Sequence, residues 1–133
     1  MHFSTILTAI ISASSMALEI RQEAARFGIA MVHPRNFTGG SDVVISYNAS
    51  TARHHPKFVD FYVQGAFAGT SNLSPWFLIQ RNDFAPDQQF LELNMTMPAA
   101  LNNVGVSGWG LTAWVTFDAD GLTQIGGIQA GNA

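Results

Sequence analysis

The chain has 133 residues, no cysteine and a formal charge of −3, which leaves room for a single domain with one core. The absence of cysteine excludes a disulfide-stapled miniature and a cysteine-ligated zinc module. Charged residues make up only 11% of the chain while 47% of it is hydrophobic, so disorder driven by charge is not expected. No two Lys or Arg residues are adjacent, so the basic footprint required for nucleic acid or anionic lipid is missing.

The first 17 residues have the pattern of a secretory signal peptide. An apolar stretch over 6–11 is followed by small residues, with Ser15 and Ala17 at the two positions read by the signal peptidase. The apolar stretch is too short to span a bilayer, although His2 is the only basic side chain in this region. We therefore expect the protein to be secreted and residues 1–17 to be removed. The mature protein is expected outside the cell or in a cell wall, without membrane contact.

The segment over residues 18–26 is the only stretch with helix-forming composition, but it is too short to stand alone as a helix. We interpret it as a flexible N-terminal segment, with a functional helix as the alternative. The C-terminal residues carry no hydrophobic tail, so a lipid anchor is not expected.

Four N-x-[ST] triplets begin at Asn36, Asn48, Asn72 and Asn94. Such triplets accept glycans only in a secretory lumen, and the triplet at Asn72 is weakened by the proline that follows it. A chain rich in Asn, Ser and Thr also produces them by chance, as ordinary turn or strand residues. Together with the signal they indicate an extracellular eukaryotic glycoprotein.

From Phe27 onward, short apolar or alternating runs separated by Gly, Pro, Asn, Asp and Ser predict an all-β domain over 27–133. Strands are expected near 27–32, 42–48, 57–64, 76–81, 89–97, 108–117 and 121–128. This number and spacing are typical of a single antiparallel immunoglobulin-like or fibronectin III-like β-sandwich.

Alternation within the strands predicts which side chains face the core. The inward set is Val43, Ile45, Tyr47, Val59, Phe61, Val63, Leu91, Leu93, Met95, Trp109, Leu111, Ala113, Val115 and Phe117. The same alternation places Trp114 on the polar, outward face of its strand. Trp76 and Phe77 stay unassigned, because either ring fits an inward position.

Several stretches resemble the extracellular β-sandwich domain of fungal glucan-assembly proteins and their Ser/Thr-rich anchored wall relatives. They are Val32-His33-Pro34 with Gly40 and Val43-Val44-Ile45-Ser46-Tyr47, then residues 59–65, and then residues 90–98. Tyr47 stands where that family usually has Trp. The resemblance implies an immunoglobulin-like fold, secretion and association with a cell wall, and it implies no catalytic residue. The Ser/Thr-rich stalk of those relatives is absent from this sequence.

No strong enzyme signature occurs, and neither a cofactor nor a metal is expected. Glycoside hydrolysis would need two neighbouring carboxylates, but Asp60 and Glu92 are expected on opposite sheets. The pair His54-His55 lacks the spacing that places two imidazoles on one ion, so we interpret it as a solvated loop. Asp120-Gly121 between two strands predicts a hairpin turn.

The remaining candidate is a surface, because the third, sixth and seventh strands of such a sandwich share one sheet and the second and fifth share the other. One exposed face then carries Tyr62, Trp114, Asp60, Gln64, Thr112 and Thr116, with Asn48 and Asn94 on the opposite sheet. Two interpretations stay open. Tyr62 and Trp114 bind a sugar ring or a protein, or they form a cross-strand pair that only stabilises the sheet.

The preferred hypothesis is a non-enzymatic module that binds polysaccharide or an extracellular protein through this face. The alternatives are a secreted effector or self-assembling surface protein with a protein target and, last, a small hydrolase that uses Asp60 or Glu92.

Overall fold

The computed structural model describes residues 24–132, so the expected signal peptide and most of the segment 18–26 lie outside the described residues. Within 24–132 the chain forms strands and one 3-10 helix, and almost no other regular structure. In chain order these elements are β1 (Ile29–His33), β2 (Asp42–Asn48), β3 (Pro56–Phe67), β4 (Phe77–Asp83), β5 (Phe90–Thr96), η1 (Ala99–Asn103), β6 (Val106–Ala119), β7 (Leu122–Gln129) and β8 (Gly131–Asn132).

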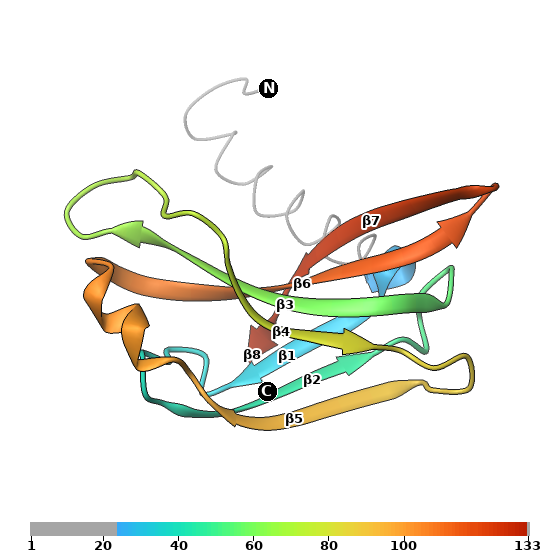
Figure 1. Cartoon of the computed structure of the whole chain (residues 1–133), viewed down its shortest axis with the longest axis horizontal. Helices are drawn as coiled ribbons and strands as arrows, with labels where there is room; N and C mark the ends of the chain where they lie inside the picture. Colours follow the sequence, from blue (N-terminus) through green and yellow to red (C-terminus); the bar gives the residue numbers. More distant parts are fainter. Residues whose placement is uncertain (1–23, 133) are drawn as a thin grey trace, which may run out of the picture.

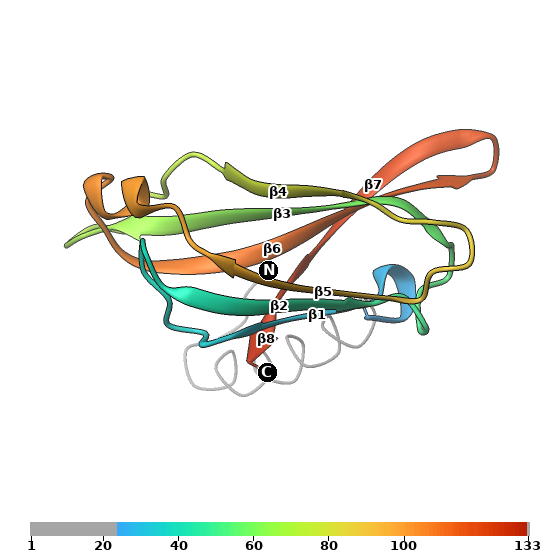
Figure 2. The ribbon, with the colours of Figure 1, turned by 60° about the horizontal axis from the view of Figure 1, so that its bottom comes forward.

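The strands form two packed sheets of four, with the orders β5-β2-β1-β8 and β4-β3-β6-β7 (Figures 1 and 2). Neighbouring strands are antiparallel except β1 and β8, which are parallel. All seven expected strands are present close to their expected ranges, and the all-β sandwich is confirmed. In Figure 2 the chain leaves the β4-β3-β6-β7 sheet at the end of β7 and continues as β8 beside β1 in the other sheet.

No sequence pattern predicts β8 or η1. Strand β8 has only two residues, Gly131 and Asn132, and neither favours a strand by itself. It forms because β1 offers an open edge next to the end of β7, where Met31 pairs with Gly131. Helix η1 buries Leu101 within a stretch whose composition indicates a loop.

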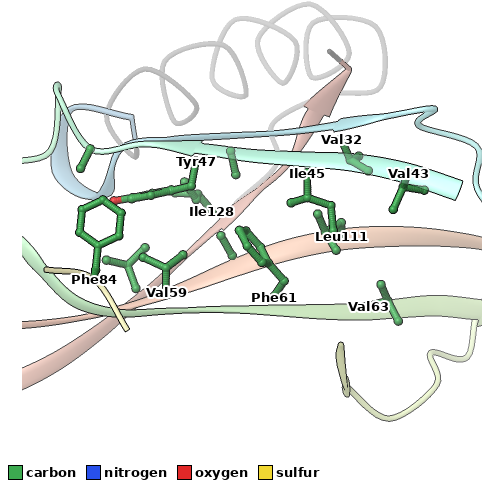
Figure 3. Packing of buried hydrophobic residues seen from close by; sticks show 14 of the residues in the cluster. Val32, Val43, Ile45, Tyr47, Val59, Phe61, Val63, Phe84, Leu111 and Ile128 are labelled. Atoms are coloured by element: carbon green, nitrogen blue, oxygen red, sulfur yellow. The ribbon is translucent and has the colours of Figure 1, made fainter. Parts of the chain in front are cut away.

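The core lies between the sheets and is built from the inward-facing residues, every second one along each strand (Figure 3). The side chains of Ile45, Val59, Phe61 and Val63 are fully buried, which confirms the predicted faces of β2 and β3. The inward residues of β5 are only half-buried, because β5 is an edge strand with a neighbour on one side.

The described start of the chain, residues 24–27, is a helical turn held against the loop before β3. The Gly28 N–H donates to the Ala24 carbonyl at 3.0 Å, and the Arg53 N–H donates to the Arg26 carbonyl at 3.2 Å. Gly28 then turns the chain with a φ of +100°, a conformation that favours glycine. For this reason β1 begins at Ile29, two residues after the expected start.

Tyr47 is fully buried and donates its hydroxyl hydrogen bond to the Phe27 carbonyl. Burial raises the pKa of the Tyr47 hydroxyl well above its ordinary value, because the phenolate is poorly solvated in the core. A raised folded-state pKa gives stability that is fully present below the unfolded pKa of about 10 and is lost as the pH rises above it.

We therefore expect the free energy of unfolding to fall by up to about 1.4 kcal/mol per pH unit above about pH 10. Urea unfolding of the wild type and the Tyr47→Phe variant across this range measures the effect. The Phe variant should lose this part of the decline, and Tyr62→Phe, the matched control, should keep it. An identical decline in Tyr47→Phe and wild type would show that this hydroxyl does not cause it.

The β6–β7 connection is the expected hairpin turn, with Asp120 at φ 55° and Gly121 at φ 76°. These positive values at both central residues are those of a two-residue type I′ turn. Next to it, the Thr123 hydroxyl donates to Asp118 at 2.8 Å and Lys57 lies 3.3 Å from the same carboxylate. The hydrogen bond from Thr123 is the larger cause, and that from Lys57 the next, of an Asp118 pKa below its ordinary value.

Candidate ligand-binding site

The six residues predicted for the binding surface all lie on the outer face of the β4-β3-β6-β7 sheet. Strand register places Asp60 opposite Trp114, Tyr62 opposite Thr112 and Gln64 opposite Gly110. Every second residue of β3 and of β6 therefore lies on this outer face, in two neighbouring rows. Thr116 follows Trp114 on the same face. The predicted distribution of the third, sixth and seventh strands in one sheet and the second and fifth in the other is confirmed.

Asp60 and Thr112 differ from the prediction, because both are buried although they lie on an outer face. Their exposed fractions are 4% and 6%. One Asp60 oxygen pairs with Arg81 Nη2 at 3.1 Å, and the Arg81 side chain is itself 71% exposed. Asp60 Oδ1 is buried without a hydrogen-bond partner among the described residues. The Asp60 side chain is therefore buried beneath this face and paired with Arg81.

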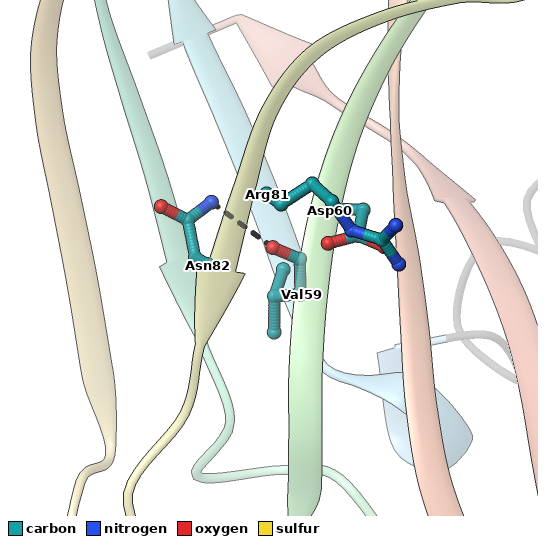
Figure 4. A network of polar contacts seen from close by, with 4 residues as sticks. All are labelled: Val59, Asp60, Arg81 and Asn82. Carbon is teal, nitrogen blue, oxygen red and sulfur yellow. Dashed lines mark hydrogen bonds and ion pairs between the residues drawn. The ribbon is translucent and has the colours of Figure 1, made fainter.

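Figure 4 shows this part of β3 with its neighbour β4 beside it in the sheet. The Arg81 side chain lies over β3 beside Asp60, while the next residue, Asn82, points away from Arg81 and donates its amide to the Val59 carbonyl at 3.0 Å. The edge strand β4 is thus attached to β3 by side chains on both sides of the sheet.

The aromatic partner of Trp114 is Trp76, which lies just before β4. The two rings are in edge-to-face contact, with centroids 5.8 Å apart and an interplanar angle of 86°. Trp76 is 43% exposed, whereas Trp114 is half-buried. The Trp114 ring lies over Gly127 of β7, since a Cβ at that position would come within 3.0 Å of the ring. Within this tryptophan pair, the Trp76 ring is therefore the more exposed one.

The orientation of Trp76 follows from Phe77, which points the other way. Phe77 packs edge-on against Trp109 with centroids 5.9 Å apart and contacts the core. Alternation along the chain then turns Trp76 outward. Sequence reasoning left both rings unassigned, because their order in the strand is set by the pairing of Val63 with Phe77.

Backbone contacts between Gly65 and Ser74 fix the segment that carries Trp76. The Ser74 N–H donates to the Gly65 carbonyl at 2.8 Å, and the Gly65 N–H donates to Ser74 Oγ at 3.2 Å. Gln64 donates its amide to the Ser74 carbonyl at 3.0 Å. Ser74 is buried, and these hydrogen bonds hold the chain against β3 two residues before Trp76.

A cleft of about 680 Å³ lies next to Trp76, where β6 continues beyond the end of β7. It is lined by Val32, His33, Pro34, Arg35, Asn36, Gln64, Trp76, Trp109, Gly110, Leu111, Thr112, Gln129 and Ala130. Its volume is in the usual range for small-molecule sites. Of the predicted surface residues, only Gln64 and Thr112 line it. Tyr62, Trp114 and Thr116 lie elsewhere on the same face.

Sequence reasoning missed the β1–β2 loop as part of this site. His33, Arg35 and Asn36 come from the β1–β2 side, whereas Gln64 and Trp76 come from the β3–β4 side. In the sequence the first group has only the features of a turn. Sheet packing alone brings the two groups together.

The four N-x-[ST] asparagines occupy three different places. Asn36 is exposed in the β1–β2 loop at the cleft, and Asn72 is exposed in the β3–β4 loop. Asn48 and Asn94 lie on the outer face of the β5-β2-β1-β8 sheet, since their neighbours Tyr47 and Leu93 face inward. The Asn48 side chain accepts a hydrogen bond from the Ser50 N–H at 2.8 Å.

The histidine pair lies in the loop before β3, as expected, and His55 is exposed. The His54 ring stacks on Phe117 with centroids 5.4 Å apart, and a His55 ring nitrogen lies 2.7 Å from the Ala85 carbonyl oxygen. Both rings thus also contact neighbouring elements. No group of three or more His, Asp or Glu suited to hold a metal ion occurs within residues 24–132.

Asp60 and Glu92 lie on different sheets, as expected, since β3 and β5 do not share one. The two residues therefore do not form the neighbouring pair of carboxylates that glycoside hydrolysis uses.

No family model matches the chain, and no curated protein or solved structure matches it. In the part of the chain that the structure describes, no helix has the length and apolar character needed to cross a membrane. The fold and the site therefore define the class: a cysteine-free β-sandwich with an aromatic-flanked surface cleft.

Proposed function

We propose that this protein is a small secreted, non-enzymatic glycoprotein of the extracellular space or cell wall that binds polysaccharide through Trp76 and the adjoining cleft. The observation that carries the proposal is the exposed Trp76 ring held edge-on against Trp114 beside a cleft of about 680 Å³. Secretion is supported by the signal-like residues 1–17, and glycosylation by the N-x-[ST] triplets at Asn48, Asn72 and Asn94, which do not line the cleft.

We further propose that the sandwich is of the immunoglobulin-like, fibronectin III-like type. The support is the strand order: β2 pairs with β5 in one sheet, and β3, β6 and β7 share the other. The buried Tyr47 of β2 stands where the resembling fungal wall domains usually have Trp, and it fills the core in the way a large aromatic residue at that position would.

The chemistry of the cleft suits a sugar. An exposed tryptophan offers a flat apolar surface at low entropic cost, which matches the apolar face of a pyranose ring. Gln64 and Gln129 in the cleft offer amide groups that both donate and accept hydrogen bonds. Apolar floor residues with a few polar groups around them are the usual composition of a ligand site.

The test is a pull-down of the protein from a secreting host on insoluble β-glucan, chitin and mannan and on immobilised polygalacturonate. We expect retention on at least one polymer and a loss of affinity of more than about tenfold for Trp76→Ala, the size typical of an aromatic anchor. Trp114→Ala should weaken binding less, because Trp114 only supports the Trp76 ring.

The matched control is Phe90→Ala, which removes an aromatic side chain that is 51% exposed on the other sheet. Phe90→Ala should bind as the wild type does, and circular dichroism should show that all three variants are folded. Retention that survives Trp76→Ala would exclude this site, and retention on no polymer would exclude polysaccharide as the ligand.

The alternative function, a self-assembling or effector protein with a protein target, is favoured by a different observation. Phe58, Leu78 and Ile125 are 40%, 44% and 61% exposed and lie on the same outer face as Trp114. Several exposed apolar side chains on one face are typical of protein contacts. Sedimentation that depends on protein concentration, together with no retention on any polysaccharide, would favour this alternative.

A further inference from the structure

The cleft carries positive charge and no negative charge. Arg35 lines it, and no Asp or Glu does, although the chain as a whole has nine acidic residues against six Lys and Arg. Within residues 24–132 the two salt bridges are Lys57–Asp118 and Arg81–Asp60, so neither involves Arg35.

The remaining carboxylate of this region is already engaged. Asp42 lines a separate depression together with His33, and its Oδ1 accepts the Thr96 hydroxyl at 2.6 Å. Asp42 therefore lies outside the cleft and does not balance the charge of Arg35 within it.

We infer that the ligand of this cleft is an acidic saccharide, one whose sugar rings carry carboxylates, as in a uronic acid polymer. This inference rests on the proposed polysaccharide binding and names the substrate class. The planar Arg35 guanidinium binds the carboxylate with two parallel hydrogen bonds, a geometry that a neutral sugar hydroxyl does not offer. Trp76 stacks on the ring, and Gln64 and Gln129 hydrogen-bond its hydroxyl groups.

Two segments far apart in the sequence bring these groups to one cavity. Arg35 comes from the β1–β2 loop and Trp76 from the segment before β4, and both line the same cleft. A saccharide in the cleft is therefore within reach of a cation for its charged group and of an aromatic ring for its ring face. This arrangement selects for a ring that carries both features.

The experiment compares the full chain, from a secreting host, on soluble oligogalacturonate and on a neutral glucan oligosaccharide by titration calorimetry. We expect tighter binding of oligogalacturonate, a loss of about tenfold for Arg35→Gln, and an intermediate loss for Arg35→Lys, which keeps the charge but not the fork. The matched control is Arg53→Gln, an exposed arginine outside the cleft, which should bind as the wild type does.

Three other results would overturn the inference, and they differ in what they imply for the proposed function. Equal binding of the acidic and neutral oligosaccharides would overturn the inference and leave the proposed function standing. An equal loss in Arg35→Gln and Arg53→Gln would show general charge attraction and would also overturn it. Binding of neither saccharide, with no retention on any polymer, would remove both the inference and the proposed function.

Discussion

Gly65→Ala is expected to lower the free energy of unfolding by about 3 kcal/mol, the upper end of the usual cost of overpacking. A Cβ at residue 65 would lie 2.2 Å from the Gly108 carbonyl oxygen and 2.3 Å from Val106 Cγ1. The first of these contacts is with backbone, so relief requires β3 and β6 to move apart. Chemical unfolding in urea measures the loss.

The same substitution tests what positions Trp76, because the Gly65 backbone is hydrogen-bonded to Ser74, two residues before Trp76. We expect Gly65→Ala to lose ligand retention as Trp76→Ala does. Gly108→Ala is the matched control, since a Cβ there meets no atom within 4 Å, and it should stay within about 0.5 kcal/mol of wild type. Equal stability of the two variants would contradict the argument.

Arg81→Ala is expected to cost about 2 kcal/mol, because it leaves the Asp60 carboxylate buried without a cation. This loss of stability is smaller than that for a fully buried pair, because the Arg81 side chain is 71% exposed and water screens the interaction. The cost comes from Asp60, whose side chain is only 5% exposed. Thermal and urea unfolding measure it.

A double variant separates the charge from the packing. Replacing Asp60 by Leu in the Arg81→Ala background removes the unpaired charge and should recover part of the lost stability, since apolar replacements of buried pairs are often neutral or stabilising. Lys57→Ala breaks the exposed pair with Asp118 and should cost less than about 1 kcal/mol. A loss in Arg81→Ala no larger than in Lys57→Ala would show that the burial of Asp60 has no energetic consequence.

The strands and their inward faces were predictable from the sequence because they depend on local pattern. In β3, apolar residues at Val59, Phe61 and Val63 alternate with polar or amphipathic ones, and a strand with one buried face requires this order. The turn at Asp120-Gly121 was predictable for the same reason, since two residues with positive φ need a sequence of this kind.

The candidate site was only partly predictable. Tyr62, Trp114, Gln64 and Thr116 were correctly placed on one outer face, because register and alternation determine it. The burial of Asp60 and Thr112 was not predictable, because it depends on side chains from neighbouring strands, such as Arg81 from β4. The exposed ring at the cleft, Trp76, precedes β4, and its direction depends on which of two adjacent aromatic residues enters the core.

The sequence by itself determined the class of fold, the number of main strands, the faces of the core and the outer face that carries Trp114. These features follow from periodicity and turn chemistry, which act over a few residues. Only the tertiary structure decided the cleft, because its walls come from the β1–β2 loop, β6, the end of β7 and the segment before β4. No local pattern records that Arg35 and Trp76 line one cavity, since the packing of two sheets brings them there.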